Sequence, residues 1–257
     1  MRDCDGAPVY RAVSAELPAS IAAVTVREFI ARATGFAGFH LMRASERLKA
    51  APASHPAQRT LSGDREIEWT WTLGHVRHGQ GRVLDFGSGN GMMAIGALFA
   101  GNDVVAVDLE PEKYAFDPHR VEYVRGDFNL LDFEPQSFDQ ILNCSSIEHV
   151  GLAGRYGSAD DAEGDLRAME KMAGLLKTGG DMVLTLPVGV DAVHRPLHRI
   201  YGEERLPRLL EHWDVREEAY WAKPNGSRFE PVSRERALSE AWSASYYALG
   251  LFVVVPR

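Results

Sequence analysis

Three glycines at alternate positions follow a strand-like apolar run near the middle of the chain. The run Val83–Phe86 leads into Gly87, Gly89 and Gly91, and a window of helical composition begins directly afterwards. Glycines at such a turn permit positive φ angles and let a ligand touch the backbone. The following helix would present free amide groups and the positive end of its dipole. The pattern indicates a ligand-binding turn, with an ordinary strand-to-helix turn as the alternative.

The residues around this turn discriminate between ligands. A dinucleotide-binding turn needs glycine where Met92 stands, and a phosphate-binding P-loop needs Lys followed by Ser or Thr where Met92 and Met93 stand. Asp108 ends the next apolar run, seventeen positions beyond Gly91. A carboxylate at a strand end suits the two hydroxyls of a ribose. The combination favours a nucleoside without phosphates, and a helix N-cap is the weaker alternative for Asp108.

Residues 82–187 resemble the class I S-adenosylmethionine-dependent methyltransferases, with a further likeness toward the C-terminus. The run Asp85–Gly91 is similar to the first motif of that family, and Gly179–Asp181 to its turn before the fifth strand, with Thr178 in place of the usual proline. The resemblance implies S-adenosylmethionine as the cofactor. The residues that it assigns to this cofactor are Asp85, Phe86, Gly87, Ser88, Gly89 and Gly91 in the first motif, Asp108 and Leu109 at the ribose, Asp127 and Phe128 at the adenine, and Asn143 and Cys144 at the methionine.

The segment Ser145–Val150 carries the candidate for a catalytic base. Methyl transfer to a hydroxyl usually needs a base, because a hydroxyl is a poor nucleophile until its proton leaves. Loops after the carboxyl ends of parallel strands line the ligand crevice in this fold class, and this segment follows the fourth strand-like run. His149 is the expected base, since imidazole titrates near neutral pH, and Glu148 would orient it or bind the acceptor. Packing or capping at the next helix is the alternative for His149.

A metal site is the less favoured alternative. Some methyltransferases hold a divalent ion through an E-x-x-E-H motif and a later histidine. In this chain Ser145 occupies the first acidic position of that motif, so one ligand is missing. We therefore predict no metal ligands, with a divalent metal ion as the alternative.

Residues for binding the acceptor are predicted from three segments. Residues 65–71, 151–157 and 198–202 together resemble a subgroup of methyltransferases found among glycan- and sugar-modifying enzymes. This likeness implies a small-molecule acceptor, with a sugar favoured. The predicted acceptor-binding residues are Arg155, Tyr156, His194, His198, Tyr201 and Trp71. A solvated helix start is the alternative for 194–199, and core packing is the alternative for Trp71.

The elements that must position these residues alternate between strand-like and helical windows. Strands are predicted at 82–86, 103–108, 121–124, 138–143 and 181–186, and helices at 91–100 and 165–177. This alternation predicts an α/β fold, a doubly wound Rossmann-like methyltransferase sheet for which we expect seven strands. A closing hairpin at the sheet edge is expected from 215–221 and 249–255. Residues 1–80 are predicted to form an N-terminal helical cap, with a helix at 64–74, before a methyltransferase domain at 81–257.

Composition limits the partners and the location of the chain. Among 257 residues there are 28 Lys and Arg against 36 Asp and Glu, a net charge of −8, with no basic stretch that would favour nucleic acid. We find neither a secretory signal nor an apolar run long enough to cross a membrane. Cys4 and Cys144 are too few for a disulfide framework. We expect a cytoplasmic protein; its oligomeric state is left open, with a homodimer as one alternative.

These expectations predict an S-adenosylmethionine-dependent O-methyltransferase that acts on a hydroxyl of a saccharide or a similar hydroxylated small molecule. A natural-product O- or N-methyltransferase is one alternative, since a neutral amine acceptor needs no protein base. A catalytically silent, cofactor-binding partner protein is the other alternative.

Overall fold

The structure is a computed structural model that describes residues 63–110, 120–154, 156, 159–224, 228–239, 241 and 247–257. The helices are α2 (Asp64–Gly74), α3 (Met92–Phe99), η1 (Ile147–His149, a 3-10 helix), α4 (Gly164–Leu175), α5 (Arg205–Leu209) and α6 (Arg234–Leu238). The strands are β1 (Arg82–Phe86), β2 (Asp103–Asp108), β3 (Val121–Arg125), β4 (Phe138–Cys144), β5 (Leu176–Val188), β6 (Ala192–His194), β7 (His198–Ile200), β8 (Trp213–Ala222), β9 (Glu230–Val232) and β10 (Ala248–Pro256). Most of the predicted cap, residues 1–62, lies outside the described residues, so the boundary at residue 80 stays a prediction.

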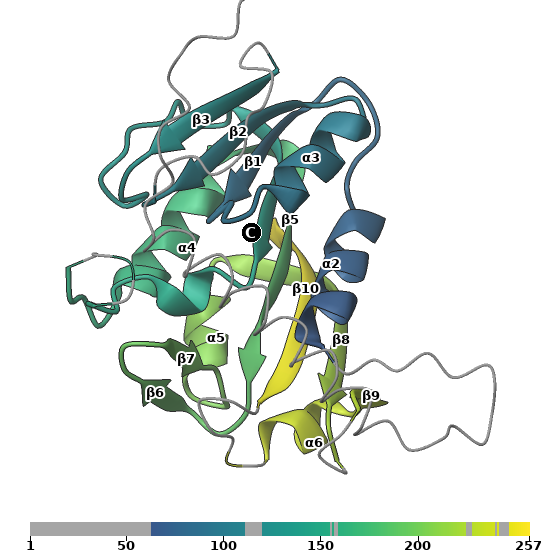
Figure 1. The fold of residues 1–257 in the computed structure, drawn as a ribbon, viewed down its shortest axis with the longest axis vertical. Coiled ribbons are helices and arrows are strands. Elements are labelled where there is room, and N and C mark those ends of the chain that lie inside the picture. The colour runs from purple at the N-terminus through teal and green to yellow at the C-terminus, as the bar shows by residue number, and fades with distance from the viewer. Residues whose placement is uncertain are drawn as a thin grey trace, which may run out of the picture. The chain divides into compact units, whose positions relative to one another are not determined.

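Eight strands of the described residues form one sheet in the order β3-β2-β1-β4-β5-β10-β8-β9 (Figure 1). The strands from β3 to β5 are parallel to their neighbours, whereas β10 is antiparallel to both β5 and β8. The predicted α/β class with a Rossmann-like sheet is thus confirmed. The sequence predicts seven strands; the eighth, β9, is a three-residue strand at the outer edge of β8 and is too short to show an apolar pattern.

The parallel strands are apolar because helices cover both of their faces. Residues Val83–Phe86 of β1 and Val104–Val107 of β2 are buried without interruption. In the register of the sheet, Leu84 lies opposite Val105 on one side and Ile141 on the other. Because these strands run in the same direction, their carboxyl ends meet at one edge of the sheet, and the loops that follow them gather there.

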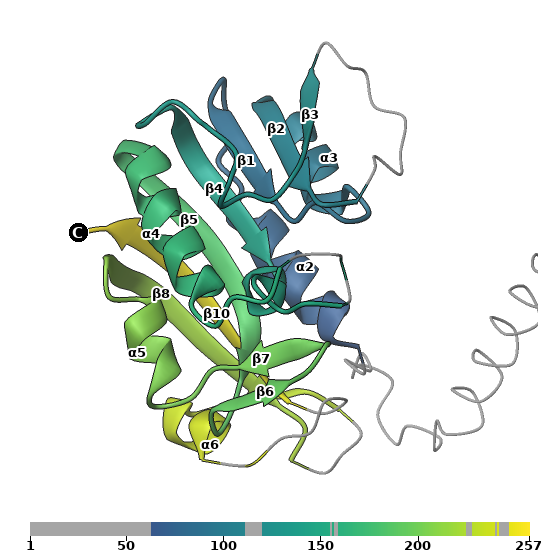
Figure 2. The same cartoon turned by 90° about the vertical axis from the view of Figure 1, so that its left-hand side faces the viewer.

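Figure 2 shows α2 and α3 on one face of the sheet and α4 and α5 on the other. One apolar core joins the sheet to α4, α5 and α6. A second core joins it to α3, where Met93 and Ala97 pack with Val83 and Val104. This arrangement is the doubly wound one that the alternation of strands and helices predicts. None of the helices that the structure describes has both the length and the apolar character needed to cross a membrane.

The two C-terminal strands form the predicted antiparallel pair near one edge of the sheet. The expected antiparallel pair forms between β8 and β10, but β10 lies between β5 and β8 and is therefore an interior strand. Its first five residues, Ala248–Phe252, are all buried, which fits a strand with a neighbour on each side. The apolar run predicts the strand itself, but it cannot tell which neighbours that strand has.

A buried glutamine in β4 fixes the segment that leads from α2 into the sheet. The side chain of Gln140 is almost fully buried. Its Oε1 accepts from the Arg77 amide at 2.9 Å, and its Nε2 donates to the His75 carbonyl at 2.9 Å and to Asp181 at 2.8 Å. Partly buried backbone groups lose stabilising hydrogen bonds when such a partner is removed, so this side chain holds α2 and its connection in place.

Replacing Gln140 with leucine should lower the free energy of unfolding by about 2–4 kcal/mol, because the His75 carbonyl and the Arg77 amide would be left unsatisfied. Urea denaturation of the wild type and the Gln140→Leu variant measures the difference. Leu130→Ala is the control, since Leu130 is 82% exposed and should change stability by less than about 0.5 kcal/mol. Equal stability of Gln140→Leu and the wild type would contradict this account.

Candidate functional site

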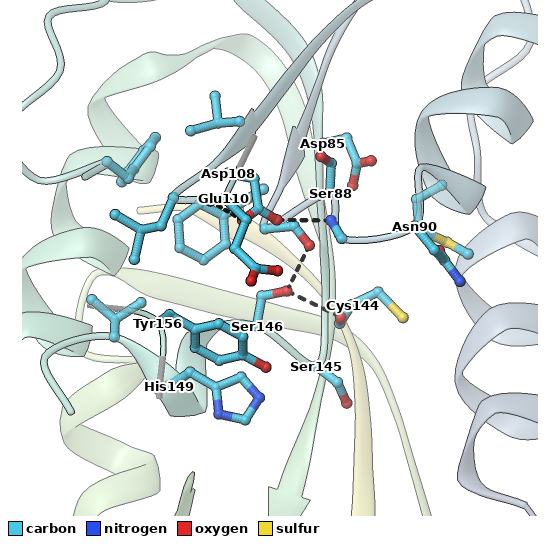
Figure 3. Close-up of a pocket in the computed structure, with 18 of the residues that line it drawn as sticks. Asp85, Ser88, Asn90, Asp108, Glu110, Cys144, Ser145, Ser146, His149 and Tyr156 are labelled. Carbon is cyan, nitrogen blue, oxygen red and sulfur yellow. Dashed lines mark hydrogen bonds between the residues drawn. The ribbon is translucent and has the colours of Figure 1, made fainter. Parts of the chain in front are cut away.

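A pocket of about 390 Å³ opens where the loops after the parallel strands meet (Figure 3). This volume lies in the usual range for small-molecule and cofactor sites. The residues that line it come from the ends of four strands, from α2 and from the segment after β4: Asp85–Asn90, Met93, Val107–Glu110, Gly126–Phe128, Cys144–Ser146, His149–Gly151, Tyr156, Arg65 and Trp69. Ten of the twelve predicted cofactor residues are among them; Gly91 and Asn143 are not.

The glycine loop after β1 adopts the left-handed backbone that the sequence predicts. Gly87, Gly89 and Gly91 have φ angles of +67°, +52° and +71°. A Cβ atom on Gly87 would lie 2.4 Å from the Oγ of Ser146, so the loop after β4 leaves no room for a side chain. Gly91 lies one step back from the pocket as the N-cap of α3, and its amide donates to the Ser88 carbonyl at 2.7 Å. Glycine is thus required at 87 by both conformation and space, and it is favoured at 89 and 91 by conformation.

Asp108 joins this glycine loop to the loop after β2. One carboxylate oxygen accepts from the Gly89 amide at 2.8 Å, and the other accepts from the Glu110 amide at 2.9 Å (Figure 3). The carboxylate therefore lies in the pocket wall, and a carboxylate has lone pairs for further donors in addition to these two amides. The helix N-cap alternative for Asp108 stays a prediction, because residues 111–119 lie outside the described residues.

Asp85 is buried beneath the glycine loop. Its Oδ2 accepts from the Ala94 amide in α3 at 3.0 Å, and this hydrogen bond fixes the start of α3 relative to β1. Burial raises the pKa of Asp85 to about 7, an effect that the Ala94 amide opposes and Asp108 reinforces. A cation in the pocket would stabilise the charged form of this carboxyl group.

The loops after β3 and β4 complete the part of the pocket assigned to the cofactor. Asp127 accepts from the Asn129 amide at 3.0 Å, and the Phe128 ring packs edge-on against Phe86 at 4.9 Å between centroids. Asn143 does not reach the pocket: it is fully buried, and its Nδ2 faces the Met172 sulfur at 3.8 Å. Its assignment to the cofactor is therefore wrong, because alternate side chains of a strand point to opposite faces.

His149 and Glu148 lie in η1, directly after the pocket loop of β4. The Nδ1 atom of His149 is 2.6 Å from the Leu197 carbonyl oxygen, and its Nε2 is 3.7 Å from a carboxylate oxygen of Glu148. A carbonyl only accepts, so Nδ1 carries a proton, and the neutral ring keeps its lone pair on Nε2. The His149 ring packs against Tyr156 at 5.4 Å, and Figure 3 shows both at the side of the pocket away from Asp85.

Helix α2 contributes pocket residues that the sequence analysis did not assign. Arg65 and Trp69 line the pocket one helical turn apart, a spacing that could have identified them as one face. Trp71 lies two positions further, so it points away and packs on His75 with ring centroids 4.3 Å apart. The predicted acceptor contact of Trp71 is therefore wrong.

Glu68 on the same helix is fully buried and connects three other side chains. One oxygen accepts from Arg65 at 3.0 Å; the other accepts from the Ser145 hydroxyl and lies 3.4 Å from that of Thr185. Ser145, which has a positive φ of 49°, is held in the pocket wall by these contacts. Burial raises the pKa of Glu68 to about 7, although Arg65 and Ser145 oppose the rise. Arg65 is three positions away, but Ser145 and Thr185 are distant in sequence, so no local pattern indicates the contacts of Glu68 with them.

The remaining predicted acceptor residues divide into one that reaches the pocket and several that do not. Tyr156 lines the pocket, whereas Arg155 lies outside the described residues. His194, His198 and Tyr201 belong to the segment of the β6–β7 hairpin and do not line the pocket. Tyr201 is fully buried with its hydroxyl on Asp165 at 3.0 Å, so its assignment to the acceptor is wrong.

Residues 194–199 do not form the solvated helix start that is their predicted alternative. They form the turn and second strand of the β6–β7 hairpin instead. Arg199 in this strand is 1% exposed, which no sequence pattern of charged residues indicates. Within the part of the chain that the structure describes, no three His, Cys, Asp or Glu side chains are grouped so that they could hold a metal ion.

The buried carboxyl of Glu68 gives a testable dependence of stability on pH. Its pKa is higher in the folded state than the ordinary value of 4.5, so its stabilising contribution is fully present below about pH 4.5 and is lost as pH rises through 7. We expect the wild type to lose about 3 kcal/mol relative to Glu68→Gln over this interval. Urea denaturation of both proteins at several pH values measures it, and a difference that does not change with pH would contradict the expectation.

The chain was compared with protein families, with curated proteins and with solved structures. A family model described as "Caenorhabditis protein of unknown function, DUF268" matches residues 122–235, which is less than half of the chain. No curated protein matches the sequence. The Burkholderia thailandensis 1,6-didemethyltoxoflavin-N1-methyltransferase, crystallised with 1,6-didemethyltoxoflavin and S-adenosylhomocysteine, is 20% identical with a TM-score of 0.52, over 97% of this chain and 99% of that one.

Two further structures have similar scores. The [4+2]-cyclase SpnF is 16% identical with a TM-score of 0.52, over 75% of this chain and 80% of its own. A complex of the Haloferax volcanii Trm112 methyltransferase activator and a putative methyltransferase gives 15% identity and a TM-score of 0.51, over 75% of this chain and 92% of that one. At these identities the likeness concerns the fold: the chain has the Rossmann-like α/β fold found in methyltransferases.

Proposed function

We propose that the protein is an S-adenosylmethionine-dependent methyltransferase that acts on a small molecule. The observation that carries the proposal is the Asp108 carboxylate, which joins the glycine loop after β1 to the loop after β2 in the pocket wall. A nucleoside ribose needs an acceptor at this place, and the glycine loop offers its backbone beside it. The methyltransferase of similar fold that was crystallised with S-adenosylhomocysteine supports the assignment.

The residues of the pocket fit this cofactor in shape and charge. Asp108 would accept from the ribose hydroxyls, and Asp127 from the exocyclic amine of adenine, with the Phe128 ring beside it. Asp85 would balance the amino group of the methionine part, and Arg65 its carboxylate. Glu68 already holds the Arg65 guanidinium in the wall at 3.0 Å. When bound, the cofactor supplies an electrophilic methyl group on a sulfonium ion.

His149 and Tyr156 define the side of the pocket at which the acceptor would bind. With its proton on Nδ1, held by the Leu197 carbonyl, the His149 ring presents the Nε2 lone pair for the proton of an acceptor hydroxyl. Glu148, 3.7 Å from Nε2, would stabilise the imidazolium that results. The residues thus provide orientation, a proton acceptor and a counter-charge, which are the contributions an O-methyltransferase needs from its protein.

A hydroxyl of a saccharide or of a similar hydroxylated molecule is the acceptor that we favour. Trp69 and Tyr156 line the pocket, and aromatic rings pack well on the apolar faces of sugars. A natural-product N-methyltransferase is the second candidate, favoured by the N1-methyltransferase of similar fold. A catalytically silent cofactor-binding protein is the third candidate. The [4+2]-cyclase of similar fold has another named activity, so the fold by itself does not establish methyl transfer.

Removing the charge of Asp108 should weaken cofactor binding. We expect Asp108→Asn to lower the affinity for S-adenosylhomocysteine by about 10- to 100-fold, because a charged acceptor for the ribose hydroxyls is lost. Isothermal titration calorimetry measures the affinity. Asp103→Asn is the matched control, since Asp103 begins the same strand at its opposite, exposed end and should leave affinity unchanged. Undiminished binding by Asp108→Asn would remove this residue from the cofactor site.

Removing the imidazole of His149 should affect turnover and not cofactor binding. We expect His149→Ala to lower turnover by about 100-fold or more and to change the affinity for S-adenosylhomocysteine by less than about twofold. His212→Ala, an exposed histidine distant in sequence, is the control. Near-normal turnover in His149→Ala would exclude it as the base and would favour an amine acceptor.

The acceptor itself can be found by incubating the protein with labelled S-adenosylmethionine and a panel of sugars, glycosides, phenols and amines, each with and without a chelator. Labelled product from a hydroxyl compound, undiminished by the chelator, is the expected result. Labelled product from amines alone would favour the second candidate. No labelled product from any compound, together with intact cofactor binding, would favour the third.

A further inference from the structure

Arg199 is a buried arginine in β7 that holds both ends of a segment of the pocket wall. Its side chain is almost fully buried, and its guanidinium donates to the Val150 carbonyl and, at 3.1 Å, to the Asp161 carbonyl. The chain between these two residues brings Gly151 and Tyr156 to the pocket. The Asp161 amide also donates to the Gly151 carbonyl at 2.9 Å, so the two ends of the segment lie side by side.

The charge of Arg199 is balanced by a buried acidic residue on α4. Asp165 is fully buried and lies 3.7 Å from the Arg199 guanidinium. It also accepts from the Tyr201 hydroxyl at 3.0 Å and from the Arg205 Nε at 2.9 Å. Burying charged groups costs free energy unless each of them is well paired, so a buried cluster of this kind is not in itself evidence of added stability. The contacts of this cluster instead give Arg199 one fixed position.

The same hairpin touches the ring of His149. Leu197 lies at its turn, where its amide donates to the His194 carbonyl at 2.6 Å, and its own carbonyl accepts from Nδ1 of His149 at 2.6 Å. The ring of His198, in β7, lies 6.4 Å from that of His149. Leu197 and Arg199 lie two positions apart in the hairpin. Leu197 contacts His149, and Arg199 contacts the segment that follows His149.

We propose that Arg199 is a positioning residue that fixes the β6–β7 hairpin against the pocket wall, so that the Leu197 carbonyl keeps the proton of neutral His149 on Nδ1. This proposal rests on the proposed function, in which Nε2 of His149 receives the acceptor proton. A ring with the other tautomer would present an N–H at Nε2 and could not receive that proton.

The geometry requires arginine and not merely a positive charge. A guanidinium carries five donors in a rigid plane, which lets it reach two backbone carbonyls while it faces Asp165. A lysine ammonium keeps the charge that balances Asp165, but it is a compact group at the end of a flexible stem. Arg199→Lys therefore separates the bridging role from charge balance.

The test is nitrogen-15 NMR of the histidine rings in the full chain, with and without S-adenosylhomocysteine, for the wild type and three variants. The wild type should show neutral His149 with its proton on Nδ1. Arg199→Lys should populate both tautomers. Leu197→Gly should do the same without altering the buried cluster, since Leu197 is exposed and glycine only frees its backbone. Tyr201→Phe, the matched control, removes one contact of Asp165 and should keep the Nδ1 tautomer.

Each outcome supports or overturns the proposal. A mixture of tautomers in Arg199→Lys and Leu197→Gly, with the Nδ1 tautomer retained in Tyr201→Phe, supports it. An unchanged tautomer in Arg199→Lys overturns it whatever Leu197→Gly shows, even if the melting temperature of Arg199→Lys falls, because Arg199 would then only stabilise the fold. Should Arg199→Lys fail to fold, Arg199→Gln, which keeps a planar amide donor but loses the guanidinium fork, is measured in its place with the same two outcomes.

Kinetics with an acceptor from the panel separates this proposal from the proposed function. Arg199→Lys should lower kcat by about tenfold or more, because a misplaced catalytic group slows the reaction, and should change the affinity for S-adenosylhomocysteine by less than about twofold. If His149→Ala retains turnover, the base assignment fails, while the tautomer measurements still decide what the hairpin does. If the wild type does not bind S-adenosylhomocysteine, the proposed function fails and the spectra without it still apply.

Discussion

The hydrogen bond from the Gly89 amide to the Asp108 carboxylate is the contact on which the geometry of the pocket depends. It brings the loop after β1 to the loop after β2, at the edge where the parallel strands end. The loop can follow this path because Gly87 leaves room for Ser146 from the loop after β4. Three strand ends are thereby held within reach of one small molecule, as expected at the carboxyl edge of such a sheet.

The opposite wall of the pocket depends on buried charges from distant parts of the chain. Glu68 of α2 holds Arg65 and Ser145, while Arg199 of β7 holds the segment after His149. In both places a charged side chain is removed from water and paired, so its position is well defined.

Much of the sheet and of the cofactor loop could be predicted because their signals are local. The apolar run of β1, the glycines after it and the acid at the end of β2 lie in continuous segments, and the structure brings them together. The contacts of Glu68 with Ser145 and Thr185, and those of Arg199 with Val150 and Asp161, could not be predicted, since these partners lie far away in sequence. The two tryptophans of α2 show the same limit: the pattern indicates a helix, but only packing decides that Trp69 faces the pocket and Trp71 the core.

The central claim, that this pocket takes an adenosine-type sulfonium donor, is tested most directly by calorimetric titration of the full chain with S-adenosylhomocysteine and, separately, with NADH. The pocket has an acid for the ribose and no glycine at Met92 for a pyrophosphate. We predict saturable binding of S-adenosylhomocysteine with one site per chain and no measurable binding of NADH. Tight binding of NADH without binding of S-adenosylhomocysteine would contradict the account.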